Sequence, residues 1–167
     1  MAITKIQSES LNLADNYDFT GTVTGAGGTN TPAFHAHASG TQTISNGVST
    51  KLEYGTETFD TDNCYDTTNY RFIPNVAGKY YFKAQARTTT TVDFTTIWMQ
   101  IYKNGSTIVS RVLQPQDDYS AVAASVIVDM NGTTDYLEAF FTHNRGTTTD
   151  LESQIYSCYS EGFRIIT

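Results

Sequence analysis

Charged side chains are scarce in this sequence of 167 residues, at 16% of the chain, against roughly 25% in an average soluble protein. Positive charge is scarcer still: 10 Lys and Arg stand against 17 Asp and Glu, which leaves a formal net charge of -7. No cluster of Lys and Arg forms a basic patch, and an acidic chain is repelled by phosphate backbones. The composition therefore predicts that the protein does not bind nucleic acid.

Long apolar runs are also missing, and none approaches the roughly 20 residues that a membrane-spanning helix needs. Residues 1–13 contain no apolar segment of the length found in secretion signals. We therefore expect no membrane insertion and no signal peptide, in a protein made in the cytoplasm of its host cell. A product that acts outside the cell would leave by a route such as lysis.

Cysteine occurs only as Cys64 and Cys158, and no Cys-x-x-Cys pair is present, which argues against zinc ribbons and thioredoxin-type sites. Two free thiols are the expected state because a reducing cytoplasm disfavours a disulfide, although the sequence leaves their pairing open. There is no Gly-x-Ser-x-Gly elbow, no phosphate-binding loop and no His-Glu-x-x-His motif. The sequence therefore predicts that the protein is not an enzyme.

The polar residues that are present are mostly Thr, Ser, Asn and Gln, and aromatic residues make up 13% of the chain. β-Branched and aromatic side chains favour strands. Apolar and polar residues alternate with a period of two, which predicts half-buried strands, in 79–87, 94–103, 120–130 and 136–143. Asn-Gly pairs between these segments supply the positive φ angles of tight turns. We expect an all-β sandwich built as a series of hairpins.

The chain divides into two parts of different composition. Residues 1–32 have scattered apolar residues and end in a Gly-rich joint, which predicts an extended N-terminal arm. Such a segment buries little surface alone, so we expect it to order against a partner. The arm residues expected to make this attachment are Ile3, Ile6, Leu11, Leu13, Tyr17 and Phe19. Residues 33–167 form the predicted globular head.

Several predicted strands have large residues on both faces, whereas one face of a sandwich strand normally meets water. We therefore expect some of these side chains to cover a subunit interface. The candidates are Phe34, Tyr81, Trp98, Tyr102 and Phe140. The alternative is that a curved sheet buries parts of both faces under its own loops.

From residue 33 onward the sequence resembles the C1q domain, a jelly roll of the C1q and tumour-necrosis-factor (TNF) type. Four segments are similar to the family's motifs in the family's order: Ala33–Ala36, Tyr70–Phe82, Met99–Gly105 and Tyr159–Ile165. Two departures, an extra Glu161 and Arg164 in place of an aliphatic residue, leave the register of the last strand open. The resemblance implies an antiparallel jelly-roll sandwich, a homotrimer, and a binding or scaffolding role without catalysis.

The arm is similar to the openings of fibre-like and virion-surface proteins of phages, in Ile3–Ile6, Leu11–Asp15 and Phe19–Val23. This resemblance implies a virion structural protein, a trimeric knob or fibre attached by its arm to a tail or capsid protein. The exposed head would then adhere to a glycan or protein of the host surface, or decorate the particle. The alternative is a free soluble C1q-like module that binds a carbohydrate or protein ligand.

His35 and His37 form the sharpest chemical pattern in the sequence. Alternation places both imidazoles on one side of a strand, roughly 7 Å apart. Around a threefold axis, three chains would supply six nitrogens, enough for an octahedral transition-metal ion. The alternative, which we favour, is a pair of neutral, hydrogen-bonded imidazoles without a cofactor. A cupin enzyme also has His-x-His, but Thr41 and Gln42 stand where its motif needs Glu.

Acidic residues alternate in the segment 60–66, as they do in calcium-binding loops. An EF-hand needs a central Gly and a Glu at its twelfth position, and this chain has Tyr65 and Arg71 there. A solvated acidic loop is therefore the better interpretation.

Overall fold

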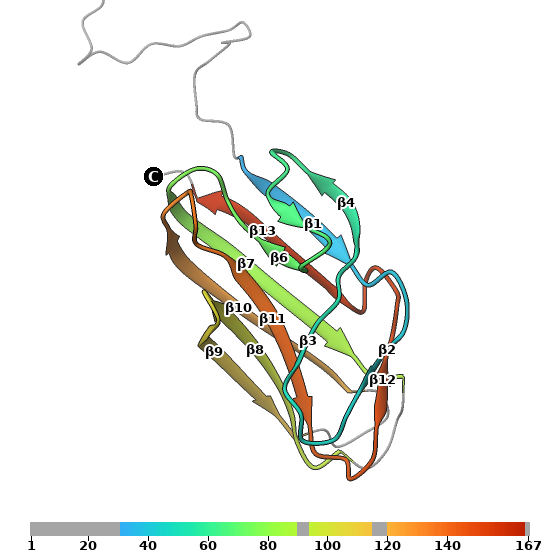
Figure 1. The fold of residues 1–167 in the computed structure, drawn as a ribbon. Helices are drawn as coiled ribbons and strands as arrows, with labels where there is room; N and C mark the ends of the chain where they lie inside the picture. Colours follow the sequence, from blue (N-terminus) through green and yellow to red (C-terminus); the bar gives the residue numbers. More distant parts are fainter. Residues whose placement is uncertain (1–30, 90–93, 115–119, 166–167) are drawn as a thin grey trace, which may run out of the picture.

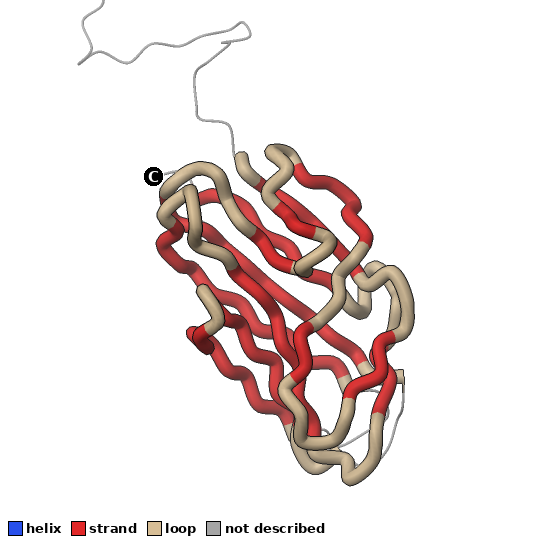
Figure 2. Tube along the Cα trace, in the orientation of Figure 1, coloured by secondary structure: helices blue, strands red, loops and turns tan. Residues whose placement is uncertain are grey.

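The computed structural model describes residues 31–89, 94–114 and 120–165. The predicted arm contacts at Ile3, Ile6, Leu11, Leu13, Tyr17 and Phe19 lie outside the described residues. Figure 1 shows two β-sheets that face each other as the layers of a sandwich. Strands and loops account for the whole described part of the chain (Figure 2), and no helix within it is long and apolar enough to cross a membrane. The prediction of an all-β sandwich is confirmed.

The first layer is a five-stranded antiparallel sheet in the order β10-β7-β13-β1-β4. Its strands are β1 (Ala33–His37), β4 (Thr56–Asp60), β7 (Gly78–Arg87), β10 (Ala121–Met130) and β13 (Tyr159–Ile165). Strands β4 and β10 are its open edges.

The second layer has the order β5-β6-β11-β8-β9, and β3 pairs with β11 beside this path. Its strands are β3 (Thr50–Lys51), β5 (Tyr65–Asp66), β6 (Arg71–Phe72), β8 (Ile97–Lys103), β9 (Ser106–Leu113) and β11 (Leu137–His143). A separate two-stranded sheet pairs β2 (Gln42–Ile44) with β12 (Thr149–Leu151).

The core lies between the two layers and follows from the alternation in the sequence. In β7 the inward residues Tyr80, Phe82, Ala84 and Ala86 are at most 1% exposed. The inward residues of β8 and β11 are buried in the same way, which confirms the predicted faces: Ile97, Met99, Ile101, Leu137, Ala139 and Phe141.

The prediction of a series of hairpins holds at one Asn-Gly pair and is wrong at two. Asn104-Gly105 joins β8 to its neighbour β9, and both residues have positive φ, as a two-residue hairpin requires. Asn131-Gly132 joins β10 to β11, which belong to different sheets. Asn46-Gly47 joins β2 to β3, which also do not pair. A jelly roll needs such crossovers between layers, and the turn residues are the same for both kinds of connection.

The last strand pairs in continuous register despite the two departures from the family's motif. Residues Tyr159 to Ile165 of β13 pair one by one with β7, without a bulge. Gly162 is placed against the ring of Phe34, where a Cβ would lie 2.9 Å from that ring and from the Tyr81 carbonyl oxygen. Arg164 donates from Nη2 to the Ala77 carbonyl at 3.3 Å. The extra residue Glu161 points outward and leaves this packing intact.

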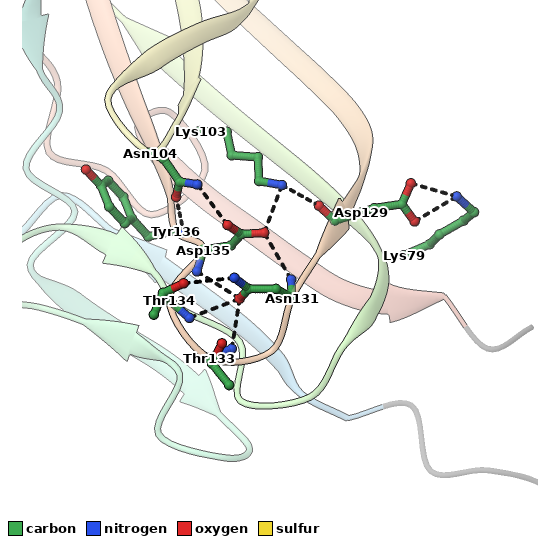
Figure 3. A network of polar contacts seen from close by, with 9 residues as sticks. All are labelled: Lys79, Lys103, Asn104, Asp129, Asn131, Thr133, Thr134, Asp135 and Tyr136. Atoms are coloured by element: carbon green, nitrogen blue, oxygen red, sulfur yellow. Dashed lines mark hydrogen bonds and ion pairs between the residues drawn. The ribbon is translucent and has the colours of Figure 1, made fainter.

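A polar network ties the β10–β11 crossover to the β8–β9 hairpin (Figure 3). The side-chain oxygen of Asn131 accepts hydrogen bonds from three backbone N–H groups, those of Thr133, Thr134 and Asp135, at 2.9 to 3.0 Å. The Asp135 carboxylate lies 2.8 Å from Lys103 Nζ and accepts from Asn104 Nδ2, also at 2.8 Å. The hydrogen bond from Lys103 lowers the pKa of Asp135. These polar groups satisfy one another's hydrogen-bonding capacity, so we assign the network a structural role.

Candidate subunit interface

The outer face of the five-stranded sheet exposes large apolar side chains to water. Phe59 on β4 is 49% exposed, Ile127 on β10 is 63% exposed, and Phe163 on β13 is 39% exposed. Each lies at an outward position of its strand, where a solvated sheet normally carries polar residues. Contiguous exposed apolar surface of this kind marks interaction sites. We call this surface the aromatic face.

Ring contacts organise the aromatic face. Tyr81 and Phe163 lie side by side across the β7–β13 pair, with ring centroids 5.2 Å apart. The His35 ring stacks on Tyr159, at 5.3 Å between centroids, and on Phe59 at 6.4 Å. These side chains come from β1, β4, β7 and β13. Because neighbouring strands hold the rings, the surface is formed before any partner binds.

His35 lines an open depression of about 460 Å³ in the aromatic face, together with Phe59, Tyr156, Tyr159 and Glu161. Its Nδ1 is 3.0 Å from the hydroxyl of Thr58. Partial burial lowers the pKa of His35; the nearby Glu161 carboxylate acts in the opposite direction, and His37 adds to the lowering. The imidazole is therefore favoured in its neutral form, which suits an apolar contact surface.

The charges on the aromatic face are paired. Lys83 donates a hydrogen bond to the Tyr159 hydroxyl and lies 3.6 Å from the Glu161 carboxylate. The hydrogen bond to Tyr159 is the main cause of the raised pKa of Lys83. The ammonium group also lies 4.8 Å from the centre of the Tyr159 ring. Pairing of this kind reduces the cost of covering the face with a partner chain.

A second exposed apolar surface lies on β9. Ile108, Val112 and Leu113 of this edge strand are 40%, 57% and 39% exposed. Strand β9 is one edge of the second layer, and β10 is one edge of the first. The two strands lie on the same side of the sandwich (Figure 1). Long exposed apolar edges invite pairing with another chain.

Residues 33–163 match the C1q domain. The chain belongs to the C1q domain family. Among solved structures it is similar to Eiger TNF from S. frugiperda, with a TM-score of 0.61 and 11% identity over 83% of this chain and 94% of that one. It is also similar to murine APRIL, with a TM-score of 0.60 and 9% identity, covering 80% of this chain and 98% of that one.

The globular domain of zebrafish complement 1qA is a further similar structure, with a TM-score of 0.52, 13% identity, and coverage of 81% of this chain and 98% of that one. No curated protein sequence matches the chain. The predicted C1q/TNF-like jelly roll is therefore confirmed. Domains of this family form homotrimers, which is the assembly that an exposed apolar face and edge would serve.

The interface residues predicted from sequence fall in three different places of the C1q fold. Tyr81 lies on the aromatic face. Trp98, Tyr102 and Phe140 are half-buried on the outer side of the other sheet, where the Tyr102 and Phe140 rings stack at 4.2 Å. Phe34 is 1% exposed, so its predicted place at an interface is wrong. Its ring stacks on Tyr65 and Phe72 inside the core.

Three residues of the aromatic face were missed by the sequence reasoning: Phe59, Ile127 and Phe163. Phe163 follows the buried Gly162, but the neighbours of Phe59 and Ile127 are exposed or half-buried, so alternation gives a weak signal for these two. The pattern of a single strand does not say which outward faces share one sheet, and that information comes only from the strand order.

His35 and His37 do lie on the same outward face of β1, as their alternation predicts. His37 Nδ1 is 3.0 Å from the Ala38 carbonyl oxygen. Within the described residues no group of three or more His, Cys, Asp or Glu side chains is placed to hold a metal ion. A metal on a trimer axis stays a prediction, which elemental analysis of the purified assembly would test.

The cysteines are free and buried, the state expected from the sequence. Burial raises the pKa of Cys158 to about 11, so its thiol remains protonated at neutral pH. Burial also raises the pKa of Cys64. Neither thiol is prepared for nucleophilic chemistry.

In the acidic segment 60–66, two carboxylates accept hydrogen bonds from the backbone of their own loop. Asp60 accepts from the Tyr65 N–H at 2.7 Å, and Asp66 accepts from the Asn69 N–H at 2.9 Å.

The lowered pKa of His35 predicts a loss of stability in mild acid. Below the ordinary value of 6.5, the unfolded chain takes up a proton that the folded chain resists, so the contribution to stability is complete above that pH and is lost as the pH falls through it. We expect the thermal midpoint to fall between about pH 7 and pH 5, and the variant His35→Gln to reduce that fall. His37→Gln is the control, and an equal reduction in both variants would contradict the assignment.

Proposed function

We propose that this C1q-family chain is a non-enzymatic structural protein of a phage virion. In this proposal three chains form the head, and residues 1–32 attach it to a tail or capsid protein. The observation that carries the assembly is the aromatic face, together with the apolar edge strand β9. The resemblance of the arm to virion-surface proteins supports the location.

A face and an edge together fit a cyclic assembly better than a twofold dimer. In a twofold dimer the same patch meets itself, whereas a ring brings two different patches together. Here the two patches differ in shape, since one is the broad outer side of a sheet and the other is an edge strand. Both patches are apolar, and no described segment of the chain packs over either of them. A closed ring of three would cover both.

The direction of the strands gives the head two distinct ends. Strand β1 begins and β13 ends at the same end of the sandwich, where the C-terminal label lies in Figure 1. An attachment that precedes β1 would therefore approach the head from this end. The opposite end, where β7 finishes at Arg87, would then point away from the particle.

Electron microscopy tests the virion location directly. Antibodies against the head should label particles of the encoding phage, and mass spectrometry of purified particles should detect the chain. The double variant Leu11→Asp, Leu13→Asp changes the predicted arm contacts, and we expect it to be missing from particles while it still forms trimers. Particles that lack the wild-type chain would contradict the proposal.

The second candidate is a free C1q-like module that binds a carbohydrate or protein ligand. Its support is the family itself, whose members include trimeric binding domains. The same fractionation separates the two candidates, because a free module would remain in the supernatant after the particles are sedimented.

A further inference from the structure

A polar depression of about 350 Å³ lies at the end of the head opposite to the start of β1. Its position follows from the register, because β1 and β7 both run toward this end and the depression begins at Arg87, the last residue of β7. The other lining residues used here are Thr41, Glu152, Ser153, Gln154 and Tyr156. We call this depression the distal pocket. It belongs to a different part of the head from the contacts of Figure 3.

Tyr156 presents an aromatic ring between the distal pocket and the depression beside His35, both of which it lines. Its side chain is 68% exposed, more than the other exposed large hydrophobic residues of the described chain. An exposed ring offers a ligand an apolar surface, and the amphipathic Tyr side chain suits contacts that are apolar on one side and wet on the other.

The turn that carries Tyr156 is held by backbone hydrogen bonds. The Ser157 and Cys158 N–H groups both donate to the Gln154 carbonyl, at 2.9 and 3.0 Å. The side chain of Gln85 donates to the Tyr156 carbonyl at 3.1 Å, and the Glu152 N–H donates to the Arg87 carbonyl at 2.9 Å. The backbone that presents the ring is therefore fixed before a ligand binds, which lowers the entropy cost of binding.

Polar groups of both kinds converge on the same pocket. Arg87 Nε lies 3.5 Å from the Glu152 carboxylate, so the pair offers donors and acceptors with no net charge. The side chains of Thr41, Ser153 and Gln154 form no hydrogen bond with the described residues, which leaves a hydroxyl or amide group of each available to a ligand.

We propose that the distal pocket binds a neutral saccharide. The apolar C–H face of a pyranose ring would pack on the Tyr156 ring, while its hydroxyl groups would exchange hydrogen bonds with the Arg87–Glu152 pair and with Gln154. The Arg87–Glu152 ion pair leaves neither charge uncompensated in the pocket, so it offers no net attraction to a charged ligand and favours a neutral one. The geometry of the site does not depend on a virion, but its use in adhesion to a host rests on the proposed function.

Binding of the full-length protein to an array of neutral glucose, galactose, mannose and N-acetylglucosamine oligosaccharides tests the proposal, followed by calorimetry with the strongest binder. We expect Tyr156→Ala to weaken binding at least about tenfold and Gln154→Ala to weaken it by a smaller factor. The matched control is Ile155→Ser, because Ile155 is exposed on the same turn and borders the depression beside His35, as Tyr156 does, but is not among the lining residues of the distal pocket. Light scattering on each variant confirms that the assembly is unchanged.

Binding that Tyr156→Ala reduces and Ile155→Ser leaves unchanged would support the site. An array without binding, or equal losses in the two variants, would overturn it. Saccharide binding by a protein that is missing from phage particles would contradict the virion proposal and leave the distal pocket standing. A particle-bound protein that binds no saccharide would overturn the saccharide site and support the virion proposal.

Discussion

Gly132→Ala is expected to lower the thermal midpoint of the protein by about 10 °C, which corresponds to roughly 3 kcal/mol or more for a chain of this size. Gly132 has a φ of 72°, in the left-handed region that costs a residue with a Cβ about 1–2 kcal/mol. A Cβ at this position would also collide with the backbone of Val76 and Ala77. Backbone atoms cannot rotate away as a side chain can, so the β10–β11 crossover would have to shift.

Gly47→Ala is the matched control for this prediction. Gly47 has the same φ of 72°, but nothing lies within 4 Å of its Cβ position. We expect it to lose only the conformational part, about 1–2 kcal/mol. Thermal unfolding followed by circular dichroism measures both variants. Equal shifts in the two would mean that the crowding at Gly132 is not present in solution.

Phe163→Asp is expected to raise the dissociation constant of the trimer by at least about 100-fold, because it places a charge among the rings of the aromatic face. The Phe163 ring contacts Tyr81 on one chain and is 39% exposed, so a partner chain is needed to cover the rest. Aromatic residues at the centre of such surfaces contribute most of the binding energy. Sedimentation velocity over a range of concentrations measures the change.

Val48→Asp is the control for the interface, since Val48 is 50% exposed and lies in the turn between β2 and β3. We expect it to leave the assembly unchanged. Far-UV circular dichroism should show that both variants retain their β structure. An intact trimer in Phe163→Asp would place the interface elsewhere on the head, with Trp98 and the Tyr102–Phe140 stack as the next candidate.

The strands could be predicted from the sequence because the alternation within a strand is a local property. The inward residues of β7, from Tyr80 to Ala86, follow directly from the period of two. Connections between strands are not local, since Asn104-Gly105 and Asn131-Gly132 have the same residue types and their glycines have similar φ angles, 77° and 72°. One closes a hairpin, and the other crosses between the sheets.

The candidate site was harder to predict for the same reason. Phe34 was an interface candidate because it is a large side chain on a predicted strand, but alternation from His35 places it inward, opposite Gly162. Phe59 and Phe163 belong to one surface because β1 lies between their strands, β4 and β13. The two residues are more than a hundred positions apart in the sequence. The distal pocket likewise joins Thr41, Arg87 and Tyr156 from three separate segments.

The mass of the purified full-length protein, measured by light scattering after size exclusion, shows directly whether the chain forms a trimer. We expect a single species of three times the 18.4 kDa chain mass. A trimer that resists dilution would support an assembly that covers the aromatic face and the β9 edge. A monomer at micromolar concentration would contradict it, because the apolar surface on both would then remain open to water.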